Sequence, residues 1–242
     1  MTRTTEKSIT SDKALYVNQM FAEIAEKYDL LNNLMTFGLH NKWKEEAVNL
    51  ALKEIKDPKS ALDLCCGTAD LAIILSNKCP QININCVDNC GEMLDIAKAK
   101  LENLKIKNID FLLADCENLS FYSWSFDIIT MGFGLRNLVN KENCLKNIFG
   151  LLKPGGVFAC IDLGYPSNYM WERLYFFYFY NLIPKLGGLF AKNKEAYTYL
   201  PASLKTWYKQ EELKDLILKT GFKKCYFKNL LGGAVAIHVA VK

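Results

Sequence analysis

Three apolar runs in the first half of the chain each end in small or acidic residues. These residues are Gly67, Asp88, and Asp115 with Cys116. A strand that turns into a helix at a small residue leaves backbone N–H groups facing outward, and these groups attract polar atoms of a ligand. A carboxylate that ends the neighbouring strand can accept hydrogen bonds from both hydroxyls of a ribose. The pattern therefore predicts a site for a nucleoside-containing cofactor.

The loop around Gly67 has one glycine where dinucleotide-binding loops usually have three. Cys65 and Ala69 stand two positions before and two positions after it. A single glycine is equally typical of an ordinary strand–turn–helix, so the support comes from Asp88, 21 residues beyond Gly67. Asn89 and the glutamate three residues later resemble a capping box. We expect Asn89 to cap the next helix and to leave Asp88 free to bind a ligand.

The third run ends at Asp115 and Cys116. An aspartate at this place can accept a hydrogen bond from the exocyclic amine of an adenine, and the next backbone N–H can reach a ring nitrogen. A surface turn is the alternative. We expect the three strand ends to converge on one adenosyl group.

Strand and helix patterns alternate from Ser60 onward, which predicts a parallel sheet with helices on both faces. The strand runs are apolar throughout, as expected for strands that are covered on both sides. Two further runs flank Leu231-Gly232-Gly233 and predict an antiparallel hairpin. The predicted strands are 61–66, 82–88, 109–115, 126–132 and 156–163, and the helices between them are 69–78, 91–105 and 141–152.

This layout is typical of class I S-adenosylmethionine (SAM) methyltransferases. Their fold is α/β and Rossmann-like, with a mostly parallel seven-stranded sheet, helices on both faces and a C-terminal antiparallel hairpin. A nicotinamide- or nucleotide-binding protein would show a fuller glycine pattern and no terminal hairpin. Two helical patterns, 14–26 and 41–56, precede the sheet, and we expect a loop rich in asparagine between them.

The composition fits a folded protein of one large domain, with 242 residues of which half are hydrophobic. The net charge of +4, from 30 basic and 26 acidic residues, is too mild for a nucleic-acid-binding face. Nine cysteines without a CxxC pair, and only two histidines, predict free thiols in a reducing cytosol and no metal site. The polar N-terminus has no signal-peptide pattern, and no transmembrane segment is predicted.

A series of motifs runs in order along residues 18–242. FAEIAEKYDLLNNLMTFGLHNKW lies near the start, and LDLCCGTADLA surrounds Gly67. FGLRN, LLKPGG, YTYLPASL and GGAVAIHVAVK follow. Together these motifs resemble the ubiquinone/menaquinone biosynthesis C-methyltransferase family. The doubled cysteine belongs to that family's own cofactor loop, which accounts for the missing glycines.

The resemblance implies that a methyl group passes from SAM to a ring carbon of a prenylated quinol. We favour demethylmenaquinol as the acceptor, although the sequence does not distinguish naphthoquinol from benzoquinol, and another small-molecule acceptor is the alternative. Two positions depart from the family, since Asp162 replaces a glutamate and Gly132 replaces a serine that helps at the cofactor. We assign cofactor binding to Thr68, Asp88, Asp115 and Cys116, and with them to Gly67 and Asp63.

Arg136 and Asn137, in the FGLRN motif, are the first candidates for handling the acceptor's proton. Only three of the 30 basic residues are arginine. The presence of one of them at this motif position, in a chain that otherwise uses lysine, indicates that a guanidinium is needed there. A guanidinium is no strong base, but it can hold a water or stabilise a developing phenolate oxygen. Alternatively, Arg136 pairs with a carboxylate and anchors its loop.

Tyr28 and His40, in the N-terminal motif, are further catalytic candidates. His40 is either a proton carrier or a packing residue, and the same alternatives hold for His238. Tyr28, with Asp29 beside it, either orders a lid or touches the substrate. The sequence does not separate these roles.

We expect residues 1–44 to form a helical extension that closes as a lid, and 45–242 to form the methyltransferase domain with a helical insertion at about 168–208. The insertion carries six consecutive aromatic residues, 175–180. A segment this apolar either forms a channel for the isoprenoid tail and contacts the membrane, or covers the core. A cytoplasmic enzyme with peripheral contact at the inner face of the membrane is therefore expected, and its oligomeric state is open.

Overall fold

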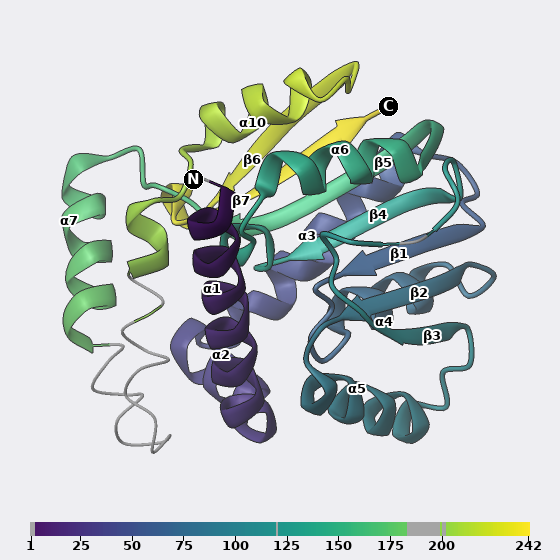
Figure 1. Cartoon of the computed structure of the whole chain (residues 1–242), viewed down its shortest axis with the longest axis horizontal. Coiled ribbons are helices and arrows are strands. Elements are labelled where there is room, and N and C mark those ends of the chain that lie inside the picture. Colours follow the sequence, from purple (N-terminus) through teal and green to yellow (C-terminus); the bar gives the residue numbers. More distant parts are fainter. Residues whose placement is uncertain (1–2, 120, 183–198, 200–201) are drawn as a thin grey trace.

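A seven-stranded sheet forms the centre of the molecule (Figure 1). The computed structural model describes residues 3–119, 121–182, 199 and 202–242. The strand order is β3-β2-β1-β4-β5-β7-β6, with antiparallel pairing only at β7, which confirms the predicted fold. The strands are β1 (Ser60–Leu64), β2 (Asn83–Asp88), β3 (Ile109–Leu113), β4 (Phe126–Gly132), β5 (Leu152–Leu163), β6 (Lys224–Leu230) and β7 (Val235–Val241).

Helices pack on both faces of the central strands, whereas the edge strands β3 and β6 are partly exposed. Successive residues of a strand point to opposite sides of the sheet. In β1, Leu62 and Leu64 belong to one hydrophobic cluster and Ala61 belongs to the other. The first face packs against α6 (Lys141–Leu151) and α10 (Gln210–Lys219), and the second against α3 (Leu39–Glu54), α4 (Asp70–Lys78) and α5 (Gly91–Leu104).

The carboxyl ends of β1 to β4 lie at one edge of the sheet. The order of the strands reverses between β1 and β4, and ligands of open α/β sheets bind beside such a reversal. The predicted convergence follows from this topology, because the loops that carry Gly67, Asp88 and Asp115 all leave from the same edge.

The C-terminal hairpin of β6 and β7 is confirmed as antiparallel. Its turn contains Gly232 at φ +64° and Gly233 at φ +100°. This left-handed backbone suits glycine, which has no Cβ to clash with the carbonyl oxygen.

The N-terminal segment is more helical than predicted. α1 (Arg3–Ile24) begins earlier than expected, and α2 (Tyr28–Thr36) occupies the asparagine-rich segment, so the predicted loop is wrong. Leu31 and Met35 lie one helical turn apart and both pack on the core, and this apolar face stabilises the helix. The predicted break occurs at Gly38, which has a φ of +74°.

α1 and α2 lie at the same end of the sheet as α7 (Tyr169–Phe177) and the π-helix η3 (Tyr178–Leu182) (Figure 1). The Tyr178 hydroxyl donates to the Met35 carbonyl at 2.8 Å and so joins the two parts. Of the predicted insertion, 183–198 and 200–201 lie outside the described residues. Within the described ranges, no helix is both long enough and apolar enough to cross a membrane.

Candidate functional site

Two cavities share a wall of aromatic side chains beside α1 and α2. The polar cavity, of about 460 Å³, lies at the strand ends and is lined by Gly67 and Asp88 among others. The apolar cavity, of about 520 Å³, lies between α2, α3 and α7. Phe21, Tyr28 and Phe133 line both. A ligand in one cavity therefore lies close to a ligand in the other.

Asp88 joins the loop after β1 to the start of α5. Its Oδ2 accepts from the Gly67 N–H at 2.7 Å, and its Oδ1 accepts from the Cys90 N–H at 2.9 Å. Burial raises the pKa of Asp88, while these backbone N–H groups act in the opposite direction. Each oxygen keeps a second lone pair for a ligand hydroxyl.

The expected helix cap at Asn89 is wrong. The N-cap of α5 is Cys90, without a side-chain cap bond, and the Asp88 carboxylate accepts from the Cys90 N–H. The carbonyl of Asn89 instead accepts from Asn18 of α1. Asp88 therefore holds the local structure and faces the polar cavity at the same time.

Asp115 and Cys116 both line the polar cavity. The Asp115 side chain closes a turn, since it accepts from the Glu117 N–H and from the Asn118 amide, each at 2.9 Å. Cys116 is buried, and its Sγ lies 3.4 Å from that of Cys65. The turn that Asp115 closes therefore also forms part of the wall of the polar cavity.

A small recess adjoins the polar cavity at Gly67 and contains Asp63 and Thr68. Thr130 donates its hydroxyl to Asp63 Oδ1 at 2.7 Å. Asp63 Oδ2, by contrast, is buried without a partner among the described residues, and burial raises the pKa of Asp63 to about 7. A buried acceptor without a donor is costly, so this oxygen is suited to a ligand that brings one.

The Thr68 side chain forms its hydrogen bond with α2 and does not line the polar cavity. Its hydroxyl donates to Asp29 Oδ1 at 2.8 Å. Lys100 Nζ lies 2.6 Å from Asp29 Oδ2 and 2.8 Å from Asp70 Oδ1, and it also donates to the Thr68 carbonyl. These bonds hold α2 on the cofactor loop. Lys100 could not be singled out from the sequence, because one lysine in a lysine-rich chain carries no distinguishing signal.

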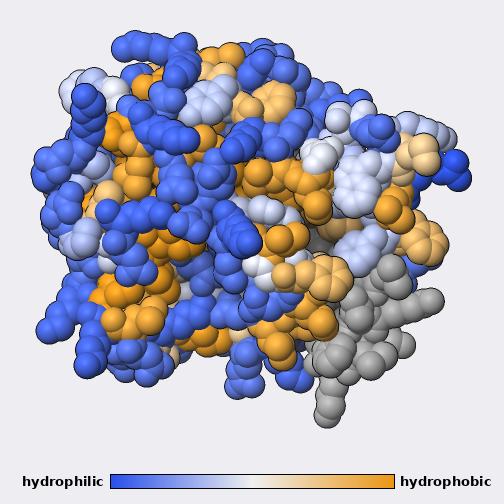
Figure 2. Space-filling model, turned by 180° about the vertical axis from the view of Figure 1, so that it is seen from behind, coloured by the Kyte–Doolittle hydropathy of each residue, from blue (hydrophilic) through white to orange (hydrophobic). Residues whose placement is uncertain are grey.

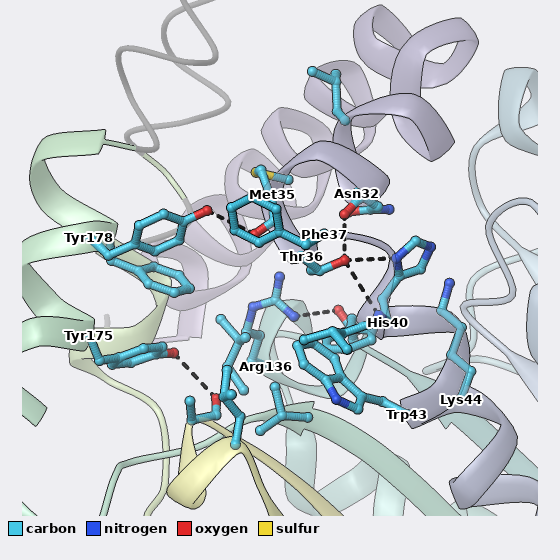
Figure 3. Close-up of a pocket in the computed structure, with 18 of the residues that line it drawn as sticks. Asn32, Met35, Thr36, Phe37, His40, Trp43, Lys44, Arg136, Tyr175 and Tyr178 are labelled. Carbon is cyan, nitrogen blue, oxygen red and sulfur yellow. Dashed lines mark hydrogen bonds between the residues drawn. The ribbon is translucent and has the colours of Figure 1, made fainter. Parts of the chain in front are cut away.

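Arg136 makes a buried ion pair with Asp162. Its Nη1 lies 2.7 Å from Asp162 Oδ1, and the side chains are 6% and 3% exposed. Nη1 also donates to the Phe133 carbonyl. Arg136 therefore does anchor its loop, as the alternative interpretation of the sequence proposed. Arg136 nevertheless lines the apolar cavity (Figure 3), and its Nε has no partner among the described residues.

Asn137 follows Arg136 in the 3-10 helix η2 (Leu135–Asn137) but lines the polar cavity. Its amide donates to the Phe133 carbonyl at 3.2 Å, and its Oδ1 accepts from the Tyr199 hydroxyl at 3.2 Å. The two neighbours thus contact different cavities.

His40 lines the apolar cavity opposite Arg136 (Figure 3). The Thr36 hydroxyl donates its one proton to the Asn32 carbonyl, so it must accept from His40 Nδ1, which lies 2.8 Å away. The proton is therefore on Nδ1, and Nε2 carries the lone pair. Burial, and then the charge of Lys44, lower the pKa of His40, which favours the neutral ring.

His238 lies outside both cavities. Its Nε2 pairs with the Gln210 carbonyl at 2.9 Å, and its ring packs near Phe227. This environment is that of a packing residue.

The two departures from the family pattern lie close to these sites. Gly132 lines the polar cavity, and a Cβ there would come within 2.8 Å of Leu71 Cδ1. A serine at this position, as the resemblance implies for the family, would therefore require a shift of the Leu71 side chain. Asp162 is the partner of Arg136, so the replacement of glutamate keeps the charge.

Comparison with known sequences gives a match over nearly the whole chain. A family model described as the ubiE/COQ5 methyltransferase family matches residues 7–242. The Rickettsia bellii ubiquinone/menaquinone biosynthesis C-methyltransferase UbiE is 37% identical, covering 98% of this chain and 96% of that protein. The protein of the same name from Pseudoalteromonas translucida is 36% identical, covering 96% and 92%.

Solved structures agree on the fold. A methyltransferase from Haloferax volcanii, in complex with the activator Trm112, has a TM-score of 0.68 at 15% identity, covering 91% of this chain and 96% of that one. A SAM-dependent methyltransferase from Aquifex aeolicus has a TM-score of 0.58 at 17% identity, covering 80% and 88%.

Proposed function

Because this chain belongs to the ubiE/COQ5 methyltransferase family, we propose that it transfers a methyl group from SAM to a ring carbon of a prenylated quinol in ubiquinone or menaquinone biosynthesis. Demethylmenaquinol is the acceptor that we favour. The proposal is carried by the meeting of a polar and an apolar cavity at Tyr28 and Phe133. A nucleoside and a ring with a lipid tail require these two surfaces side by side.

The direct test is incubation with labelled SAM and with each reduced prenyl-quinone in turn. We expect label in the naphthoquinol product. Transfer to a benzoquinol alone would correct the acceptor, and transfer to neither would contradict the quinol proposal.

The residues of the polar cavity fit SAM, which supplies an electrophilic methyl group on a sulfonium. Asp88 would accept from the ribose hydroxyls, and Asp115 with the Cys116 backbone would meet the adenine. The unpaired Asp63 Oδ2 is suited to the ammonium of the amino-acid part. Thr68 contributes by holding the loop against α2.

Cofactor binding should become tighter as the pH rises through about 7. The pKa of Asp63 is raised to about 7 by burial, so this group is mostly protonated near pH 6 and mostly ionised near pH 8. Only the carboxylate attracts an ammonium group, and the dissociation constant should therefore fall about tenfold across this interval. Calorimetry in buffers of different ionisation enthalpy should also detect proton release on binding.

The matched variant for this measurement is Asp63→Asn, which keeps an acceptor for the Thr130 hydroxyl. It should bind SAM weakly, with little dependence on pH over the same interval. Equal affinity of the wild-type protein at pH 6 and pH 8 would remove Asp63 from the cofactor site.

We propose that His40 and Arg136 handle the proton of the acceptor. A quinol ring carbon becomes nucleophilic when the neighbouring hydroxyl loses its proton, because the charge spreads into the ring. The neutral His40 can accept this proton at Nε2, and the Arg136 Nε–H can donate to the oxygen where charge develops. Tyr28 and Asn137 would orient the ring toward the methyl group.

We also propose that residues 1–44 act as the lid. Phe21 and Tyr28 line both cavities. The bonds from Thr68 to Asp29 and from Asn18 to Asn89 hold this segment on the cofactor loops. A lid at this place would exclude water from the reacting groups.

The rim of the apolar cavity carries exposed hydrophobic side chains. Phe37 is 83% exposed, Leu174 55% and Phe177 56%, and Figure 2 shows apolar and aromatic side chains gathered on the side of the molecule where α7 lies. An isoprenoid tail is stored in the bilayer. We propose that this rim contacts the membrane and admits the tail.

Replacing Leu174 and Phe177 together with serine should weaken vesicle binding and raise KM for a long-tailed quinol by about tenfold or more, because each large apolar side chain contributes about 1.5–3 kcal/mol when buried. A short-tailed quinol should be methylated at the wild-type rate. Flotation with liposomes and steady-state kinetics measure the two effects. Tyr122→Ser, at a side chain 89% exposed outside both cavities, is the matched control. Unchanged flotation of the double variant would contradict membrane contact.

A further inference from the structure

Three thiols lie together at the wall of the polar cavity. Cys65 follows β1, Cys116 follows β3, and Cys144 lies in α6. The Sγ atoms of Cys65 and Cys116 are 3.4 Å apart, and both residues line the cavity. Cys144 is fully buried and does not line it. The reaction proposed above needs none of the three sulfurs.

Hydrogen bonds among the three thiols shift their pKa values in opposite directions. The neighbouring Cys144 and Cys65 thiols lower the pKa of Cys116 by hydrogen bonding to its sulfur, and the pKa values of Cys65 and Cys144 are raised by the same bonds. A thiolate, rather than a thiol, is the nucleophile toward peroxides. Because the two sulfurs are in contact at 3.4 Å, an oxidised Cys116 can be resolved by Cys65.

We propose that Cys65 and Cys116 form a reversible oxidation site for hydroperoxides, and that their disulfide closes the polar cavity to SAM. This inference rests on the cofactor cavity and is independent of the identity of the acceptor.

The chemistry balances with one hydroperoxide. The Cys116 sulfur attacks the terminal peroxide oxygen, the O–O bond breaks, and the alcohol leaves with a proton, so that Cys116 becomes a sulfenic acid. The Cys65 sulfur then forms the S–S bond while the S–O bond breaks, and hydroxide leaves as water with the Cys65 proton. Two thiols lose two electrons in total, and the hydroperoxide is reduced to an alcohol and water.

Closure of the cavity is the expected consequence of forming this disulfide. A disulfide bond is about 2.05 Å long, so the sulfurs must approach by more than an ångström from their 3.4 Å separation. This movement draws the loop after β1 toward the loop after β3. Gly67, two residues beyond Cys65, donates to Asp88 across the cavity edge, so the shift displaces the bond that positions the ribose-binding carboxylate.

The test treats the full-length protein with hydrogen peroxide, blocks free thiols and maps the tryptic peptides without reduction. We expect peptide 60–78 joined to peptide 108–136, and at least a tenfold loss of affinity for S-adenosylhomocysteine that dithiothreitol reverses. Cys66 shares the first peptide, so Cys66→Ser should still form the link and Cys65→Ser should not. Saturating S-adenosylhomocysteine, which would occupy the cavity that both residues line, should slow the reaction at least tenfold.

Three outcomes would overturn the proposal. They are a link that persists in Cys65→Ser, oxidation of Cys116 to a sulfinic acid without any link, and unchanged affinity of the linked protein for S-adenosylhomocysteine. None of these measurements uses a quinol, so failure here is distinguishable from failure of the proposed function.

Discussion

Replacing Arg136 with methionine should remove nearly all methyl transfer and lower the free energy of unfolding by about 3–5 kcal/mol. The loss of stability arises because Asp162, with a side chain 3% exposed, would keep a buried charge without its cation. The loss of activity arises because no N–H would remain to stabilise the acceptor oxygen as charge develops on it. Urea unfolding and single-turnover transfer of labelled methyl measure the two effects separately.

A double variant separates stability from catalysis at this site. Arg136→Met with Asp162→Asn removes both charges and keeps a side-chain acceptor near the Arg136 and Leu163 backbone N–H groups, which bind Asp162 in the wild-type protein. It should recover much of the stability while its turnover stays about 100-fold or more below wild type. Wild-type turnover in this folded double variant would show that Arg136 is only a structural anchor.

Replacing Asp88 with alanine should weaken SAM binding by about 100-fold or more. The carboxylate is proposed to take two ribose hydroxyls, and a hydrogen bond to a charged group contributes about 1.5–3 kcal/mol. In the wild-type protein, Asp88 also accepts hydrogen bonds from the Gly67 and Cys90 N–H groups. The variant loses both bonds, so the loop that contains Gly67 should also shift. Calorimetric titration with SAM or S-adenosylhomocysteine measures the change.

The control for this experiment is Asp110→Asn, an exposed aspartate on the adjacent strand β3 that lines neither cavity. It should bind SAM as the wild-type protein does. If Asp88→Ala is folded and its dissociation constant stays within about threefold of wild type, Asp88 is a structural cap and the cofactor site is wrongly placed.

The order of strands and helices, and the edge at which the site lies, were predictable from local patterns. Apolar runs of strand length, with Gly67 and Asp88 at their ends, predict a parallel sheet, and parallel strands necessarily bring their carboxyl ends to one edge. The terminal hairpin was predictable from its turn, since Gly232 and Gly233 permit a tight connection between antiparallel strands. The local pattern gave a wrong prediction at α2. The asparagines indicated a loop, but packing of Leu31 and Met35 on the core stabilises a helix.

The partners of the functional side chains were decided only by the tertiary structure. Thr68, assigned to the cofactor from its motif, binds Asp29 of a helix 39 positions earlier, and Arg136 pairs with a residue 26 positions later. The physical reason is the sequence separation over which each interaction acts. Periodicity and turn chemistry describe forces between residues a few positions apart, whereas the meeting of two cavities at Tyr28 depends on how α1, α2 and α7 pack across the finished sheet.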